Sequence, residues 1–403
     1  MLAHPEAVST EEPDASNPGE EAAPAISVLL VDDQPLITGA VRDMLATEED
    51  IALHVCHDPR QAATLACGLA PSVILLDLAM PHMDGLTLLK RLRSDPATLE
   101  IPIIVLSGRN DPTIKACAFT HHADDYLIKL PDRIELIARI RHHSAAYKAR
   151  LERDRCKMQM ALELAQAAKY VRSLLPAPIQ NDRLRIDWRF VPSDQLGGDA
   201  LGYRWLDADH IALYMLDVIG HGVGASLLAV NVLTALSHQT LPDTDFLDPS
   251  AVAYALNSVF RMERHGQRFF TIWYGVYDTR QRTLSFSGGG HPQPLLFSDA
   301  TEPDTKPIAL PLCGPPIGVA DSAVFQNQTI NAPPHSRLLI YSDGVVEVQD
   351  PQRSVADQQA FMDFVSLTGP ADDLLDLILN RARQIRQSAT LDDDCSLVQV
   401  DFI

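Results

Sequence analysis

The sequence of 403 residues has no excess of basic residues, no closely spaced cysteines and no long apolar run. Its 33 Lys and Arg are outnumbered by 53 Asp and Glu, a formal net charge of −20 that argues against nucleic acid or an anionic membrane as a partner. Its six cysteines include no C-x-x-C pair, which excludes a zinc ribbon or disulfide framework and fits a reducing compartment. No apolar run approaches the roughly 18 residues of a membrane helix. We therefore expect a cytoplasmic protein.

The first 25 residues also lack Lys and Arg, so they do not have the basic-then-apolar order of a signal peptide. Their acidic side chains, with several Pro and Ala, cannot bury enough apolar surface to fold, which predicts a solvated tail over 1–25. The rest is ordinary globular composition, 46% apolar and 21% charged. At roughly 150 residues per domain, the length predicts two or three domains.

Strands and helices alternate in residues 26–145. Short apolar runs predict strands at 26–32, 51–56, 72–77, 101–107 and 124–129. Both faces of most of these strands are apolar, as in a parallel sheet covered by helices on both sides. Five such units predict a doubly wound, flavodoxin-like α/β domain with its site at the C-terminal ends of the strands.

A long helical stretch follows, from about residue 132 to 175, with no Pro or Gly. Apolar or small residues recur there at a spacing of three and four, interrupted by Ser144, Asp154 and Arg172. This pattern predicts a coiled-coil linker over 146–180 that forms a homodimer through residues 137–175, with a seam weakened by alanines. A surface helix packed on its own domain is the alternative.

The pattern becomes β-rich in residues 181–403. Strands are predicted at 184–191, 210–218, 269–278, 282–289, 337–343 and 395–402, and helices at about 224–239, 249–262, 355–366 and 371–386. Grouped strands with inserted helices favour an α+β sandwich.

Five chemistry-bearing residues fall at strand ends of the first domain. Asp32 and Asp33 close the first strand and Asp77 the third, and these two strands are neighbours in a flavodoxin-like order. Clustered carboxylates repel one another unless a cation joins them, and Mg²⁺ prefers oxygen ligands. Ser107 and Lys129 end the fourth and fifth strands. The set predicts a site for a magnesium-bound phosphoryl group.

This region resembles the receiver domain of bacterial response regulators, through VDDQP (31–35), LLDLAMPHMDG (75–85), VLSG (105–108) and DDYLIKLPD (124–132). The resemblance implies that Asp77 accepts a phosphoryl group from a sensor histidine kinase, and that Asp32 and Asp33 hold Mg²⁺. It also implies that Ser107 and Lys129 contact the phosphoryl oxygens and that Tyr126 is the switch aromatic. The KLPD ending departs from the usual Lys-Pro, which affects only the geometry expected for that loop.

A second group of aspartates lies at strand ends or turns of the sandwich: Asp199, Asp217, Asp343 and Asp393. Oxygen ligands without His or Cys suit Mg²⁺ or Mn²⁺ rather than zinc. Two such ions about 4 Å apart can hold a phosphate ester and generate a hydroxide for in-line attack. The group therefore predicts a two-metal site.

The segment after Asp217 also imitates a dinucleotide-binding fingerprint, with Gly220, Gly222 and Ala225 in a G-x-G-x-x-A order. The aspartate at the strand end would face the pyrophosphate, and the required βαβ unit is missing downstream. We therefore do not expect a Rossmann site.

Residues 170–403 resemble the SpoIIE-like branch of the metal-dependent PPM serine/threonine protein phosphatases. The resemblance rests on SLLP (173–176), the GGD ending at Asp199, D-V-x-GHG (217–222), GGHP (289–292), PIGV (316–319), SDGVVE (342–347) and the closing Asp-Asp pair. It implies that Asp199, Asp217, Asp343, Asp393 and the Val218 carbonyl bind metal, with Asp394 as the alternative last ligand. His221 and His291 are possible substrate contacts, although turn or packing roles are the alternative.

Two positions depart from this family pattern. Ile219 stands where the family usually has Ser, and Leu201–Gly202 replaces the usual aromatic-Asp pair after GGD. Both changes spare the metal carboxylates and would alter only the fit of the substrate.

The combined interpretation is a response regulator whose output domain dephosphorylates phosphoserine or phosphothreonine on a partner protein. The family resemblance makes an anti-anti-sigma (STAS) protein the expected substrate. The alternative is a non-catalytic scaffold that binds a sigma-regulatory partner, but such a scaffold would not need a repulsive carboxylate cluster.

Overall fold

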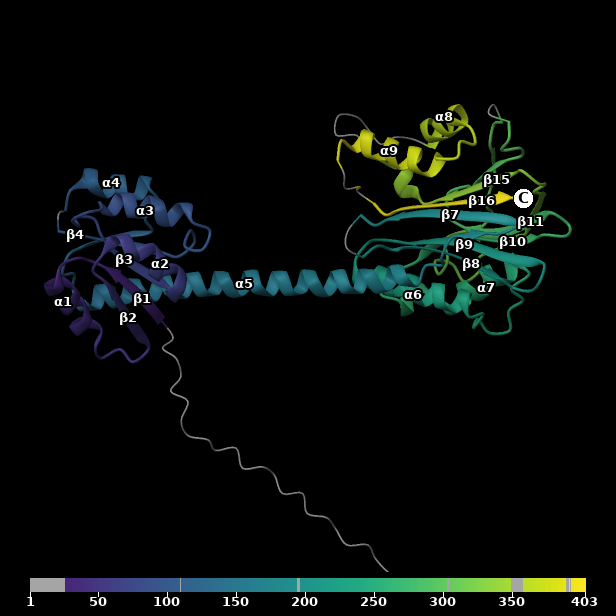
Figure 1. Ribbon diagram of the computed structural model, residues 1–403. Helices are drawn as coiled ribbons and strands as arrows, with labels where there is room; N and C mark the ends of the chain where they lie inside the picture. Colours follow the sequence, from purple (N-terminus) through teal and green to yellow (C-terminus); the bar gives the residue numbers. More distant parts are fainter. Residues whose placement is uncertain are drawn as a thin grey trace, which may run out of the picture. The chain divides into compact units, whose positions relative to one another are not determined.

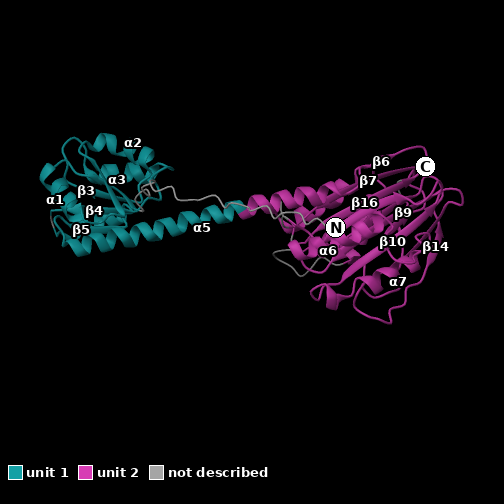
Figure 2. Ribbon diagram, turned by 90° about the horizontal axis from the view of Figure 1, so that it is seen from below, with its two compact units in different colours: residues 1–159 teal, residues 160–403 magenta. Residues whose placement is uncertain are grey.

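The computed structural model describes residues 26–108, 110–193, 196–302, 305–348, 358–388, 391 and 393–403. The predicted acidic tail at 1–25 lies outside these described residues. The chain divides into two compact units, residues 1–159 and 160–403, and the division falls inside one long helix (Figure 2). Within the described residues, no helix combines the length and apolar character needed to cross a membrane.

The first unit contains a five-stranded parallel sheet in the order β2-β1-β3-β4-β5 (Figure 1). Its strands are β1 (Ile26–Val31), β2 (Ile51–Cys56), β3 (Val73–Asp77), β4 (Ile103–Ser107) and β5 (Asp125–Ile128). This is the flavodoxin-like order, so the predicted fold class is confirmed.

Helices cover both faces of this sheet. They are α1 (Pro35–Leu45), α2 (Pro59–Leu69), α3 (Gly85–Ser94), α4 (Pro112–Thr120) and the start of α5 (Arg133–Ser173). Helices α1 and α5 share one apolar core with the sheet, and α2, α3 and α4 share the other. Pro at the first turn of α1, α2 and α4 suits a position whose N–H has no helical partner.

Helix α5 packs on the first unit through its N-terminal part, where Leu136, Ile137, Ile140 and Ser144 are buried. Beyond them, Tyr147 packs against the core and Arg150 pairs with Glu100. From residue 145 to 174 no side chain of the helix is buried. Apolar side chains nevertheless lie along this stretch, with Leu151 44%, Met158 65% and Leu162 53% exposed. A helix of this length with exposed apolar residues is typical of a segment that pairs with another helix.

The second unit is a sandwich of two antiparallel sheets. One has the order β14-β11-β10-β9-β8 and the other β13-β12-β15-β16-β7-β6. The strands are β6 (Ile179–Gln180), β7 (Leu184–Val191), β8 (Asp199–Trp205), β9 (His210–Val218), β10 (Phe270–Asp278), β11 (Thr283–Gly289), β12 (Leu295–Phe297), β13 (Ile308–Ala309), β14 (Gln328–Asn331), β15 (Arg337–Tyr341) and β16 (Cys395–Phe402). The predicted sandwich class is confirmed, although β8 and four shorter strands were not predicted.

Helices cover the outer faces of the sandwich (Figure 1). Helices α6 (Val223–Ser237) and α7 (Pro249–Val259) pack on the first sheet, and α8 (Gln358–Thr368) and α9 (Leu374–Arg386) on the second. The predicted start of α8 at residue 355 lies outside the described residues. The predicted strand 337–343 ends earlier, at Tyr341, and a short 3₁₀ turn (Asp343–Val345) follows it.

Aromatic side chains fill the space between the two sheets, with Trp273, Tyr277 and Phe286 almost fully buried. Tyr274 is buried on the other face of β10, where its hydroxyl donates to the Phe246 carbonyl. Burying side chains of this size contributes about 2–3 kcal/mol each. This core holds the strand ends that carry the second acidic group in a fixed arrangement.

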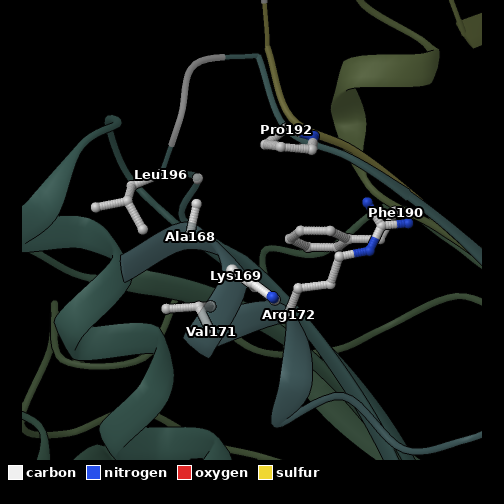
Figure 3. Close-up of a pocket in the computed structure, with 8 residues that line it drawn as sticks. Ala168, Lys169, Val171, Arg172, Phe190, Pro192 and Leu196 are labelled. Atoms are coloured by element: carbon white, nitrogen blue, oxygen red, sulfur yellow. The ribbon is translucent and has the colours of Figure 1, made fainter. Parts of the chain in front are cut away.

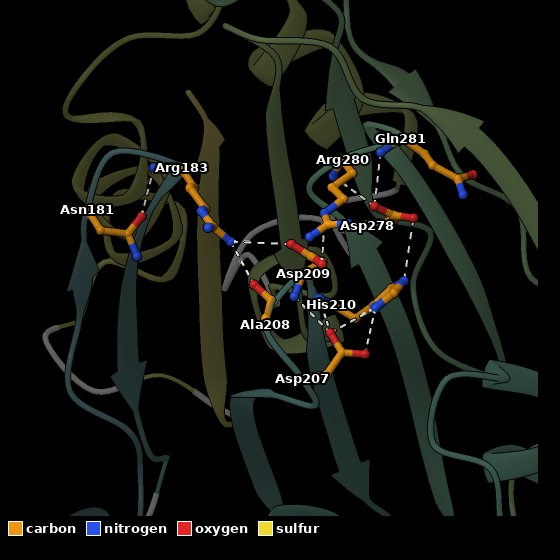
Figure 4. A network of polar contacts seen from close by, with 9 residues as sticks. All are labelled: Asn181, Arg183, Asp207, Ala208, Asp209, His210, Asp278, Arg280 and Gln281. Atoms are coloured by element: carbon orange, nitrogen blue, oxygen red, sulfur yellow. Dashed lines mark hydrogen bonds and ion pairs between the residues drawn. The ribbon is translucent and has the colours of Figure 1, made fainter.

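A polar network ties the hairpin turns at the start of β9 and the end of β10 (Figure 4). Asp207 accepts hydrogen bonds from the His210 backbone and ring, and Asp278 accepts the backbone N–H groups of Arg280 and Gln281. The His210 ring also lies 3.4 Å from Asp278. The network fixes the start of β9, the strand that carries Asp217 near its other end.

Candidate functional site

The first acidic centre lies at the C-terminal ends of the parallel strands. Asp32 and Asp33 directly follow β1, and Asp77 ends β3. Each of these three carboxylates offers an oxygen within 4.8 Å of the others, and Asp33 Oδ1 is buried without a hydrogen-bond partner. A compact set of oxygen ligands with an unsatisfied buried atom fits a hard divalent cation such as Mg²⁺.

Lys129 lies between two of these aspartates. Its Nζ is 2.7 Å from Asp77 Oδ2 and 2.9 Å from Asp32 Oδ2, and both carboxylates are fully buried. Burial raises the pKa of Asp32 against the effect of Lys129, while the hydrogen bonds to both aspartates outweigh burial and raise the pKa of Lys129. The ammonium therefore compensates much of the repulsion expected from the clustered carboxylates.

The other predicted receiver residues surround the same edge of the sheet. Ser107 ends β4, and its carbonyl accepts the Lys129 N–H at 2.7 Å. Tyr126 is buried in β5, with the Lys115 ammonium 5.6 Å from its ring centre. Leu130, in the loop that departs from the family pattern, has a left-handed backbone with φ of 54°. The phosphoryl and switch roles stay predictions.

The second acidic centre borders a cavity of about 300 Å³ in the sandwich. The cavity is lined by Asp217, Val218, Ile219, Gly220, His221, Phe269, Phe270, Thr271, Asp343 and Asp393. Asp199 pairs with Asp217 across β8 and β9 and is only 2% exposed. The structure therefore brings together all four aspartates that the sequence singled out.

These carboxylates are buried close to one another, and their charges interact. Burial, followed by the charges of Asp343 and Asp393, raises the pKa of Asp217 to about 8. Burial also raises the pKa of Asp343 to about 6 and that of Asp199 well above its usual value. Such a cluster is stabilised when positive charge is added to it.

The donor set fits divalent metal ions. Both carboxylate oxygens of Asp199 are buried without a hydrogen bond in the described part of the chain. A β-carbon on Gly198 would fall 2.5 Å from the Val218 carbonyl oxygen, so glycine is required where the two segments meet. Within the described residues, only the first centre has three carboxylates within 4.8 Å of one another.

Asp394 has a different role from its neighbour Asp393. Its Oδ2 accepts the Gly198 N–H at 2.6 Å, and its Oδ1 accepts the backbone N–H and the hydroxyl of Ser193. Asp394 is 3% exposed, whereas Asp393 lines the cavity. Of the two alternatives, this geometry favours Asp393 as the metal ligand and Asp394 as the residue that anchors the Gly197–Asp199 loop.

The two predicted histidine contacts occupy different environments. His221 lines the cavity and is exposed. His291 is 5% exposed, is not among the cavity-lining residues and bonds the Thr271 hydroxyl at 3.0 Å. The structure thus favours a packing role for His291 over a substrate contact. Ile219, where the family usually has Ser, lies at the cavity and is 49% exposed.

Sequence reasoning missed one acidic neighbour of this centre. The charge of Glu347 raises the pKa of both Asp343 and Asp393, after the larger effect of burial. Its backbone N–H bonds the Asp343 carbonyl at 2.8 Å, one helical turn away. The four-residue spacing from Asp343 is a signal from which the sequence could have identified it.

A smaller cavity of about 270 Å³ lies beside the loop that leads into Asp199 (Figure 3). It is lined by Ala168, Lys169, Val171, Arg172, Phe190, Pro192, Leu196 and Gly197. The last turns of α5 therefore share this cavity with the loop that leads to Asp199.

Known proteins match both units. The model of the response regulator receiver domain matches residues 28–141, and that of Stage II sporulation protein E (SpoIIE) matches residues 207–403. The chain is 28% identical over 249 residues to phosphoserine phosphatase RsbP of Bacillus subtilis, covering 61% of this chain and 59% of RsbP. It is 38% identical over 117 residues to the transcriptional regulatory protein TrcR of Mycobacterium tuberculosis, covering 29% of this chain and 44% of TrcR. The chain spans less than two thirds of the length of these curated relatives.

The fold of the sandwich is also found among solved structures. The SiaA-PP2C domain of Pseudomonas aeruginosa has a TM-score of 0.51 at 17% identity, covering 62% of this chain and 99% of that domain. Fold and acidic centres together define a protein in which a receiver domain precedes a PP2C-like domain. The first unit matches the response regulator receiver domain and the second matches SpoIIE, so both resemblances predicted from the sequence are confirmed.

Proposed function

We propose that the chain is a two-component response regulator with protein phosphatase output. A sensor histidine kinase phosphorylates Asp77, and the C-terminal domain dephosphorylates phosphoserine or phosphothreonine on a partner protein. The observation that supports this most strongly is the convergence of Asp217, Asp343 and Asp393 on one cavity beside the buried Asp199. The family resemblance favours a phosphorylated anti-anti-sigma (STAS) protein as the partner.

In the receiver, a carboxylate oxygen of Asp77 bonds to phosphorus as the bond from phosphorus to the kinase histidine breaks. Lys129 already lies 2.7 Å from Asp77 and can neutralise charge on the phosphoryl oxygens. Asp32 and Asp33 would hold the Mg²⁺ that the resemblance implies. Ser107, at the end of the neighbouring strand, would bind another phosphoryl oxygen.

In the phosphatase domain, Asp199, Asp217, Asp343, Asp393 and the Val218 carbonyl would hold two Mn²⁺ or Mg²⁺ ions. Such ions neutralise phosphate charge and make water a better nucleophile at neutral pH. Hydrolysis breaks the bond between phosphorus and the serine or threonine oxygen and releases inorganic phosphate and the free hydroxyl. Asp394 acts in this scheme by positioning the loop of Asp199.

The linker helix would connect the two sites. Its apolar residues at 151, 158 and 162 lie exposed at the spacing of a coiled-coil seam. The predicted seam began at Ile137, but Ile137 and Ile140 are buried on the first unit. We infer a homodimer through the exposed part of the helix, residues 145–174, in which phosphorylation of Asp77 changes the rate of the phosphatase domain.

Hydrolysis of p-nitrophenyl phosphate by the full chain tests the catalytic assignment. We expect turnover that requires Mn²⁺ or Mg²⁺ and falls by about 10²-fold or more in Asp217→Asn and Asp343→Asn, since each change displaces a catalytic group. Hydrolysis that persists in EDTA, or folded variants with activity near that of the wild type, would contradict the two-metal assignment. A folded, metal-binding wild type without turnover would favour the scaffold.

A further inference from the structure

The helix that follows the catalytic cavity has an unusual outer face. None of the fifteen residues of α6 is charged, although 21% of the chain is charged. Its inner face is buried on the sheet, but Val223 and Leu227 on its outer face are 50% and 60% exposed. The outer face of a surface helix ordinarily carries charged groups. An uncharged, partly aliphatic face is typical of a surface that a partner covers.

This face begins at the cavity itself. Ile219 lines the cavity and is 49% exposed, directly before the turn that leads into α6. Val223 and Leu227 are four residues apart and therefore lie on the same side of the helix. We refer to Ile219, Val223 and Leu227 as the α6 ridge.

One cation borders this ridge. The Arg268 guanidinium lies against Gly224 in the first turn of α6, where a β-carbon would fall 2.7 Å from Nη2. Within the described part of the chain, this guanidinium has no hydrogen bond or ion pair. Arg268 directly precedes Phe269, which lines the cavity. A guanidinium that pairs with none of the described residues, beside an apolar ridge, is suited to a carboxylate from a second molecule.

We propose that the α6 ridge and Arg268 dock the phosphorylated partner protein through a segment with aliphatic side chains and an acidic residue next to its phosphoserine. The proposal rests on the proposed phosphatase function and adds the features of the substrate that the enzyme selects. With metal ions bound, the cavity would recognise the phosphoryl group that all phosphoserine segments share. Contacts that distinguish one partner from another must therefore lie outside the cavity, through apolar burial at the ridge and pairing with Arg268.

Two synthetic phosphoserine peptides of equal length test this, one with Leu, Ile and Glu flanking the phosphoserine and one with only Gly and Ser. We expect the full-length wild type to prefer the first by about tenfold or more in kcat/KM. In Leu227→Asp and Arg268→Glu, kcat/KM for the two peptides should become nearly equal. Hydrolysis of p-nitrophenyl phosphate should stay within about twofold of the wild type, because neither side chain lines the cavity. Val223→Thr, which nearly preserves the shape of the side chain, should reduce the preference for the first peptide by a smaller factor.

Leu367→Asp is the matched control, because Leu367 is 89% exposed on α8, across the sandwich from α6 (Figure 1). It should leave the peptide preference unchanged. Equal kcat/KM for the two peptides in the wild type overturns the docking proposal and leaves the phosphatase function standing. Absence of metal-dependent p-nitrophenyl phosphate hydrolysis in the wild type overturns the phosphatase function, and the docking proposal with it. A change from dimer to monomer in Leu227→Asp would make the ridge a contact between two copies and also overturn docking.

Discussion

Gly197 lies in direct contact with the carboxylate of Asp394, and a β-carbon on Gly197 would fall 2.2 Å from Asp394 Oδ2. That carboxylate cannot turn away, because it accepts N–H groups from Ser193 and Gly198. The loop before Asp199 is thus wrapped around a side chain from a segment almost two hundred residues later in the sequence. This contact explains the first glycine of the GGD motif.

Gly197→Ala should therefore destabilise the C-terminal unit by about 1–3 kcal/mol, the usual cost of forcing extra atoms into a packed site. Metal-dependent hydrolysis should also fall, because the displaced loop carries Asp199. Thermal unfolding and p-nitrophenyl phosphate turnover check both effects. Gly39→Ala is the control, since a β-carbon there meets nothing within 4 Å in helix α1 and alanine favours a helix. Equal melting temperatures for Gly197→Ala and the wild type would contradict the steric argument.

Asp393 and Asp394 should respond differently to the same substitution. Asp394→Asn replaces one acceptor oxygen by an NH₂ group that faces N–H donors, so stability should fall by about 1–3 kcal/mol even in EDTA. Asp393→Asn removes one charge from a crowded cluster, so the metal-free protein should keep its stability while Mn²⁺ affinity falls. Chemical denaturation measures the stability of each variant, and titration calorimetry measures its Mn²⁺ affinity. Weaker Mn²⁺ binding in a stable Asp394→Asn protein would make Asp394 the metal ligand and Asp393 the residue that anchors the loop.

Asp77 should be the residue that takes phosphate from acetyl phosphate in the presence of Mg²⁺. It ends the central strand β3, between the strand that leads to Asp32 and Asp33 and the strand that ends at Ser107. A phosphoryl group on Asp77 would lie beside Asp32, Asp33 and Lys129 and next to the strand that ends at Ser107. Intact-protein mass spectrometry should show one phosphoryl adduct in the wild type and none in Asp77→Asn. Asp84→Asn, at an exposed helix N-terminus, is the control and should keep the adduct.

His291 should contribute less to the stability of the C-terminal unit as the pH drops below neutrality, whereas the raised pKa values of Asp217 and Asp343 act in the opposite direction in the metal-free protein. Burial lowers the pKa of His291 to about 3, and its Nε2 is buried without a hydrogen-bond partner. Because the folded-state pKa lies below the unfolded value of about 6.5, only the unfolded chain binds this proton between the two values. This contribution is present above pH 6.5 and is lost on acidification, by about 2 kcal/mol at pH 5. The unfolding free energy of the wild type should fall by about 2 kcal/mol relative to that of His291→Gln between pH 7 and pH 5, while exposed His335→Gln should follow the wild type.

The elements with a clear apolar pattern could be predicted from the sequence. Strand 210–218 was predicted with its observed bounds, because a continuous apolar run ends at a turn rich in glycine. Strand β8 was missed because it begins with Asp199 and contains Gly202. The reason for Gly202 lies in another strand, since a β-carbon there would fall 2.4 Å from the Tyr214 ring. Gly202 is also one of the two departures from the family pattern after GGD.

The candidate residues could be predicted as groups but not as pairs. Motifs placed Asp32, Asp77 and Lys129 at one edge, but only the fold shows that the ammonium contacts both carboxylates. Adjacent Asp393 and Asp394 are equivalent in sequence, and the direction of each side chain depends on strand β16 and the loop near Ser193. Local patterns specify elements, whereas such contacts depend on segments far apart in the chain.

The exposed stretch of α5 should hold two copies of the chain together. A single helix with Leu151, Met158 and Leu162 in water gains little from packing, so pairing with a second copy would bury these side chains. We expect a dimer at micromolar concentration by sedimentation, and Met158→Lys with Leu162→Lys should convert it to a monomer without changing the melting of either unit.

The alanines of the same seam provide the test of signalling. Ala161 and Ala165 leave the seam weak, so a few kcal/mol from phosphorylation of Asp77 could shift its pairing. Replacing both by Leu should strengthen the seam and make the phosphatase rate independent of phosphorylation. Turnover with and without beryllofluoride, in the wild type and the double Leu variant, measures the coupling. Equal regulation in both proteins would show that the signal does not pass through α5, and a monomeric wild type would exclude the dimer.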